Sequence, residues 1–245
     1  MPPNVVAVRA GWRATVDVAR EDSIILTLPT GDRQLQRFTR HGVFALDVDS
    51  TGRVALQLES LTVTPPQTNA SHRPTDASWT SEIGTSQIEA FKVDRGGDDA
   101  AALLAVVRNL LPRIPAPGVA RQAAWQDSAN GTVRVDIFDA QEHRIGSWVA
   151  EPAVQRDGGR ETPVQVHETF EQIGDGSEGG MKITMTSQGK RSGTYYVSSN
   201  GKVVSAQLAD SVSMLISVPS RQQVVPTTRF SRTTVRFTAA AHAPA

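Results

Sequence analysis

Cysteine is absent from this chain of 245 residues, which excludes a disulfide framework, a thiolate metal site and a cysteine nucleophile. An excess of charge of either sign is also absent, since 25 basic side chains balance 25 acidic ones. That balance argues against a protein that binds nucleic acid by neutralising phosphates. Aromatic residues are scarce at 5%, while 39% hydrophobic and 20% charged residues are typical of an ordinary folded domain.

Long apolar runs are missing as well. The longest nearly uncharged stretch runs from Ala100 to Leu111, about 12 residues, whereas a transmembrane helix needs roughly 20. The first residues show no basic region followed by an apolar run. We therefore expect no transmembrane segment in this sequence. The compartment stays open: the bacterial periplasm or envelope if a signal peptide has been removed, and the cytoplasm otherwise.

Short motifs of known chemistry are incomplete. Asp47 to Gly52 has the oxygen side chains and the glycine that open a calcium loop, but Leu58 stands where a bidentate Glu is needed, so a hairpin turn is the favoured interpretation. Gly174 to Gly179 matches G-x-G-x-x-G, yet a strand-like sequence follows instead of a helix, which favours a flexible loop. The histidines are isolated and offer no paired metal ligands: His41, His72, His143, His167 and His242. We predict no catalytic residue, no metal site and no cofactor.

Apolar residues that recur at every second position predict a protein made mainly of antiparallel strands. Near the start, Val16–Val18 and Ile24–Leu28 are expected to be two strands joined across Arg20-Glu21-Asp22. The clearest hairpin joins 43–46 to 54–58 through a turn at Asp49–Gly52. Further strands are expected around residues 35–39, 133–137, 145–149, 164–170, 181–185, 194–197, 212–218 and 221–238. Charged residues are expected at the outward positions of these strands, where they keep a large sheet soluble.

One helix is expected between the two strand-rich regions. Asp98 or Asp99 is a suitable N-cap, apolar residues then follow at helical spacing, and Pro112 ends the pattern. The apolar stripe favours a helix that packs on a sheet over one that docks on a partner or lies on a membrane. The stripe consists of Leu103, Leu104, Val107, Leu110 and Leu111.

An internal similarity suggests two related halves. The stretch Gly42–Val54 resembles Gly193–Val203 in its aromatic strand, glycine turn, basic residue and valine. We therefore predict a β half over 1–97, a helix and proline-rich connector over 98–118, and a second β half over 119–245, together forming either two units or one continuous domain. Four tryptophans stand out as core residues at sheet ends or, alternatively, as anchors of a pocket or interface: Trp12, Trp79, Trp125 and Trp148.

The proline-rich stretch that runs from Leu111-Pro-Arg-Ile-Pro115 to Trp125, set between long meander strands, resembles β-rich proteins of the bacterial envelope. These include the half-barrel carriers of lipoproteins and lipids. Ala123-Ala124 stands here in place of the Gly-Asp expected before the tryptophan. The resemblance implies a curved β fold and transfers no site residue to this chain.

The expected fold is a large antiparallel twisted sheet or open barrel of two meander halves, with one helix packed against it. Because no catalytic motif is present, the leading functional hypothesis is a non-enzymatic structural or interaction protein with a protein partner, for example an extramembrane accessory subunit of a larger, membrane-associated bacterial assembly. The alternative is a carrier that shelters a lipid or other apolar ligand between the curved sheet and the helix, with Leu103, Val107 and Leu110 facing the ligand. A hydrolase with dispersed catalytic residues is the third hypothesis.

Overall fold

The computed structural model describes residues 12–51, 53–65, 78–82, 92–95, 124–135, 137–156, 159–199 and 203–239. These residues form one antiparallel sheet of twelve strands and a short 3-10 helix, η3 (Pro219–Arg221). The strands are β1 (Trp12–Thr27), β2 (Arg33–Val48), β3 (Arg53–Thr64), β4 (Ser78–Glu82), β5 (Lys92–Arg95), β6 (Ala124–Val135), β7 (Phe138–Ala150), β8 (Val154–Arg156), β9 (Gly159–Glu178), β10 (Met181–Ser198), β11 (Val203–Val218) and β12 (Gln223–Ala239).

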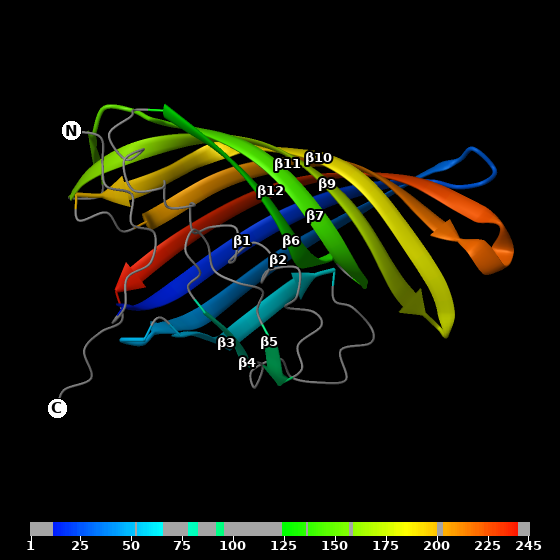
Figure 1. The fold of residues 1–245 in the computed structure, drawn as a ribbon, viewed down its shortest axis with the longest axis horizontal. Coiled ribbons are helices and arrows are strands. Elements are labelled where there is room, and N and C mark those ends of the chain that lie inside the picture. Colours follow the sequence, from blue (N-terminus) through cyan, green and yellow to red (C-terminus); the bar gives the residue numbers. More distant parts are fainter. Residues whose placement is uncertain are drawn as a thin grey trace.

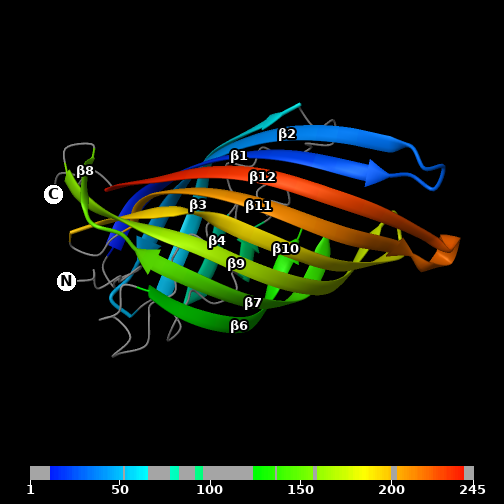
Figure 2. The same ribbon diagram turned by 90° about the horizontal axis from the view of Figure 1, so that it is seen from above.

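Two meanders join in this sheet. Strands β1 to β5 lie side by side in chain order, and so do β6, β7 and β9 to β12, with β8 paired only to β9. The first and last strands, β1 and β12, pair with each other and connect the two runs. Figures 1 and 2 show a single sheet that curves strongly along its width. The predicted antiparallel meanders are therefore confirmed, and they share one continuous sheet.

The first strand corrects a prediction. β1 is unbroken, although the sequence suggested two strands joined across Arg20-Glu21-Asp22. Arg20 and Asp22 stand in the same alternation as Val16 and Val18, so all four side chains point to the buried face. The polar triplet remains in the strand because its buried charges bind polar groups on neighbouring strands, which offsets the cost of desolvation. The expected strands 35–39 and 43–46 likewise merge into β2.

The glycine-rich stretch Gly174–Gly179 was also wrongly predicted as a flexible loop. Its residues up to Glu178 belong to β9, and the turn to β10 consists of Gly179 and Gly180, with φ of 57° and 78°. A Cβ atom at Gly174 would lie 2.8 Å from Cβ of Ala140 on β7. Glycine therefore allows neighbouring strands to approach closely here.

The sheet has a buried inner face and a polar outer face. Because side chains alternate along each strand, every second residue points inward. Outward positions carry residues such as Arg13, Asp17, Lys190 and Arg232, as the sequence predicted. The inner face is mostly apolar, but it also carries buried charged residues, so the expectation that charges occupy the outward positions is only partly correct.

The buried apolar residues form two clusters. The first cluster contains Trp12, Ala14, Val16, Val18, Phe44, Leu46, Val48, Val54, Leu56, Leu58, Trp125, Trp148, Val164, Val166, Tyr195, Val197, Val203, Ala206, Leu208 and Val235. The second cluster contains Val133, Val135, Phe138, Ala140, Phe170, Ile183, Met185, Val212 and Met214. The predicted helix, including Leu103, Val107 and Leu110, lies outside the described residues, as does most of the proline-rich connector.

Candidate functional site: a polar stripe on the inner face

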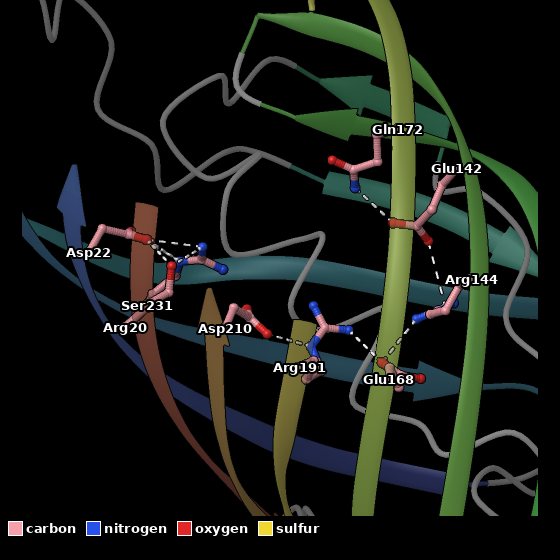
Figure 3. A network of polar contacts seen from close by, with 9 residues as sticks. All are labelled: Arg20, Asp22, Glu142, Arg144, Glu168, Gln172, Arg191, Asp210 and Ser231. Carbon is pink, nitrogen blue, oxygen red and sulfur yellow. Dashed lines mark hydrogen bonds and ion pairs between the residues drawn. The ribbon is translucent and has the colours of Figure 1, made fainter. Parts of the chain in front are cut away.

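A row of polar side chains crosses the inner face between the two apolar clusters. Five residues on five consecutive strands stand directly opposite one another in the strand register, and we call this row, with the polar side chains bonded to it, the polar stripe (Figure 3). The row consists of Asp22 on β1, Ser231 on β12, Asp210 on β11, Arg191 on β10 and Glu168 on β9. The pairing of strands thus places these side chains next to each other across the sheet.

Arg191 lies between two carboxylates at the centre of the stripe. Its Nε atom donates to Oδ1 of Asp210 at 2.7 Å, and its Nη1 atom donates to Oε2 of Glu168 at 3.1 Å. The side chains of these three residues are exposed by 10% or less. Burial alone would lower the pKa of Arg191, but the two carboxylates more than offset this effect and raise it. The guanidinium is therefore a permanently charged group in an interior site.

The stripe continues onto β7 through a second arginine. Nη1 of Arg144 lies 3.7 Å from Oε2 of Glu168, and Nε of Arg144 lies 3.8 Å from Oε1 of Glu142. Glu142 also accepts a hydrogen bond of 2.8 Å from Gln172, whose Oε1 in turn accepts one of 2.9 Å from the hydroxyl of Ser187. Residues from three strands are connected in this way, so the stripe is one network at this side.

The opposite end of the stripe is built around Asp22. Its carboxylate accepts hydrogen bonds from Nε of Arg20 at 3.0 Å, from Nη1 of Arg40 at 2.7 Å and from the hydroxyl of Ser231 at 2.6 Å. Burial of Asp22 would raise the pKa of its carboxyl group, but the charge of Arg20, the hydrogen bonds from Arg20 and Ser231, and the charge of Arg229 outweigh burial, so the pKa is lowered. Asp22 is therefore held in its ionised form.

Three of the four tryptophans lie in the first cluster, on one side of the stripe. Trp12, Trp125 and Trp148 are buried there, and the rings of Trp125 and Trp148 stack with centroids 6.1 Å apart. The side chain of Trp79 lies outside the described residues. Burial agrees with the interpretation as core residues at a sheet end. A role as interface anchors stays a prediction.

The other sequence motifs lie away from the stripe. In the turn between β2 and β3, Oδ1 of Asp49 accepts hydrogen bonds from the backbone N–H groups of Thr51 at 2.8 Å and Arg53 at 3.0 Å, as a hairpin turn requires. His41, His143 and His167 are exposed on the outer face. Within the described ranges, no group of three or more His, Asp or Glu residues is placed to hold a metal ion. In the same part of the chain, no helix is long and apolar enough to span a membrane.

The polar stripe was missed by the sequence interpretation, although one signal pointed to it. Glu168 stands on the same face of its strand as Val164, Val166 and Phe170, and Asp210 alternates in the same way with Leu208. A single charged residue among the inward apolar positions of one strand does not show which residues bind it. Partners for it can be assigned only when the register between strands is known.

Together, these features define the class of protein: a single-layer, strongly curved antiparallel sheet whose buried face is apolar at both ends and charged between them. Neither a family model nor a curated protein matches the sequence. A solved structure on lipid–protein interactions in lipovitellin matches with a TM-score of 0.53 at 11% identity, over 97% of this chain and 26% of the lipovitellin chain. This chain thus spans about a quarter of that protein.

Two matches with lower scores are OccK7 (OpdD) of Pseudomonas aeruginosa and Neisserial surface protein A. The former has a TM-score of 0.31 at 7% identity, covering 94% of this chain and 100% of that chain. The latter has a TM-score of 0.23 at 9% identity, covering 91% and 96%. Scores this low do not indicate a common fold. The likeness to lipovitellin agrees with the expected β-rich, open and curved sheet, and it shows similarity of fold alone.

Proposed function

We propose that this protein is a non-enzymatic carrier that holds a lipid or another apolar ligand against the inner face of its curved sheet. The observation that carries this proposal is the inner face itself, on which two clusters of buried apolar side chains extend over the strands of a single-layer sheet. Concave, mostly apolar surfaces with a few placed polar groups are typical of small-molecule sites. The likeness of fold to lipovitellin supports the same proposal.

The outer face provides a contrast that an experiment can use. It exposes apolar side chains one at a time among polar ones, among them Ile145, Ile173 and Leu215, which are about half exposed or more. Single exposed apolar residues are ordinary on protein surfaces. A lipid that binds without specificity would meet these residues first, whereas a carried lipid would contact the inner positions of the same strands.

Photolabelling distinguishes the two faces. A fatty acid with a photoreactive diazirine in its tail is mixed with the full-length protein, irradiated, and the labelled residues are mapped by tandem mass spectrometry. We expect label at inner positions that are only partly buried, such as Ile216, Val218 and Phe237, and none at their outward neighbours. The variant Ile173→Ser, altered only on the outer face, should give the same labelling pattern and yield. Label concentrated on Ile145, Ile173 and Leu215 would contradict the proposal.

The other hypotheses from the sequence stay predictions. These are a protein partner in a larger assembly, a place in the bacterial envelope and the absence of enzymatic activity. A role of Leu103, Val107 and Leu110 in holding a ligand also stays a prediction, because these residues lie outside the described ranges.

A further inference from the structure

The alternation of apolar and polar side chains is lost at one end of the sheet. The chain reads Ile-Ile-Leu-Thr-Leu over 24–28, where β1 ends, and Val-Val-Pro over 224–226, where β12 begins. The two runs are close together, because Leu26 pairs with Thr227 across the sheet. Figures 1 and 2 show the turn after β1 and the turn before β12 at the same end of the molecule. We call this end the apolar tip, and it consists of Ile24, Ile25, Leu26, Leu28, Val224 and Val225.

The apolar tip presents partly exposed apolar side chains on both faces of the sheet. Ile24 and Leu26 continue the inward alternation of Asp22, whereas Ile25 points outward, and none of these three isoleucine and leucine residues is fully buried. Leu28 is 38% exposed and Val224 is 52% exposed. Near-continuous apolar runs are typical of strands that are covered on both faces. The tip therefore has the composition of a covered segment, yet its side chains remain accessible.

The exposed charges around the apolar tip are mainly positive. Arg33 and Arg37 lie on β2, Arg221 lies in η3, and all three side chains are exposed. The segments 23–37 and 211–228 contain these three arginines and a single acidic residue, Asp32. The Asp32 carboxylate accepts a hydrogen bond of 2.9 Å from the hydroxyl of Thr30. An apolar end with a cationic rim complements a surface that is apolar inside and anionic at its boundary.

We propose that the apolar tip docks on an anionic lipid bilayer, with its apolar side chains at the acyl boundary and its arginines among the head groups. Segments that lie in a membrane interface combine apolar residues with basic ones in this way, and anionic head groups attract the basic ones. Long arginine side chains reach the head groups from a deeper backbone position. Lipid can surround both faces of the tip, whereas a second protein that packs on the sheet covers one face.

The backbone of the apolar tip is suited to a shallow position in the bilayer. Polar backbone groups must be hydrogen-bonded where water is scarce. β1 pairs with β2 up to Thr27 and with β12 up to Leu26. In the turn that follows, the N–H groups of Leu28 and Gly31 donate to the carbonyl oxygens of Asp32 and Leu28, each at 2.8 Å. This inference goes beyond the proposed function and does not depend on it.

Vesicle co-sedimentation tests the docking on the full-length protein. Large unilamellar vesicles of phosphatidylcholine alone are compared with vesicles of phosphatidylcholine and phosphatidylglycerol in equal amounts. We expect binding to the mixed vesicles to be at least about tenfold tighter, because each basic residue at an anionic surface contributes several-fold. Added salt should weaken this preference, since it screens exposed charges. The variant Arg33→Gln/Arg221→Gln should lose most of the preference for the mixed vesicles.

Two matched double variants test the apolar contribution. Leu28→Ser/Val224→Ser alters the tip at two accessible side chains, and it should bind the mixed vesicles at least about tenfold more weakly, since less apolar area is then buried. Ile145→Ser/Val149→Ser is the control, because these side chains on β7 are 52% and 43% exposed. This control should bind as tightly as the wild type.

A fluorescent label locates the contact without removing apolar side chains from the core. Because the chain contains no cysteine, one introduced cysteine carries a single label. Val224→Cys labelled with the environment-sensitive dye NBD should shift its emission to the blue when mixed vesicles are added. The same dye at Ile145→Cys should keep the emission that it has in buffer.

Failure of the docking and failure of the carrier function give different results. No binding to either kind of vesicle, or equal binding to both, overturns the docking and leaves the carrier function to the photolabelling experiment. Equal blue shifts at positions 224 and 145 overturn the assignment to the tip. Self-association that Leu28→Ser/Val224→Ser abolishes, without vesicle binding by the wild type, would assign the tip to a second copy of the chain and overturn the docking. Should a serine variant fail to fold, the labelled cysteine variants decide the assignment.

Discussion

Replacing Arg191 by glutamine should cost more stability than almost any other single change in this protein. Arg191 compensates two carboxylates, with N–O distances of 2.7 Å to Asp210 and 3.1 Å to Glu168, and all three side chains are nearly inaccessible to water. Removing one partner of such a buried pair typically costs about 3–5 kcal/mol, because a buried charge is left uncompensated. A whole domain is commonly stable by only about 5–15 kcal/mol. The single variant should therefore unfold at a much lower urea concentration.

Urea unfolding at pH 7 measures this effect, provided that the slope of unfolding free energy against urea stays unchanged. The double variant Arg191→Gln/Asp210→Asn is expected to recover about 2 kcal/mol of the loss, since charges of both signs are then removed together. Lys190→Gln, on the outer face of the same strand, should stay within about 0.5 kcal/mol of the wild type. A cost of less than about 1 kcal/mol for Arg191→Gln, or a double variant less stable than the single one, would refute the reasoning.

Three further changes follow from the same inner face. The lowered pKa of Asp22 means that its carboxylate stabilises the fold above its unfolded pKa of about 3.9 and loses this effect as the pH falls through the folded value. The stability difference between wild type and Asp22→Asn should thus shrink below about pH 4 in acid titrations of unfolding, and a constant difference would contradict the assignment. Gly189→Ala places a Cβ against the Phe170 ring and should cost about 1–3 kcal/mol in thermal unfolding, whereas an unchanged Tm would show that the ring moves freely. Trp148→Ala removes a nearly fully buried indole from the first cluster and should cost about 3–5 kcal/mol in urea, a value that an exposed interface residue would not reach.

The alternation of apolar residues was enough to predict the general fold. Val133, Val135, Met185 and Val212 are all inward-facing strand residues, as their spacing indicated. The turn at Asp49 was recognisable because its polar residues and glycine have local conformational preferences. Strand type, meander order and the approximate turn positions depend on such local signals, and they could therefore be read from one sequence.

The polar stripe could not be read in the same way. The sequence Arg20-Glu21-Asp22 taken alone is typical of a turn, and Glu168 interrupts the apolar face of its strand without an evident reason. These charged residues are stabilised by contacts between distant parts of the chain, such as the hydrogen bond between Asp22 and Ser231, which are 209 positions apart. The pairing of β1 with β12 creates those contacts, and no local preference specifies that pairing.

The most direct test of the carrier function is native mass spectrometry of the full-length protein, purified without detergent from cells that contain lipids. The inner face, with its apolar clusters, predicts a population heavier than the polypeptide by the mass of one lipid. Extraction should recover and identify that lipid. A single mass equal to that of the polypeptide, together with no recoverable lipid and no uptake of added palmitate, would contradict the account.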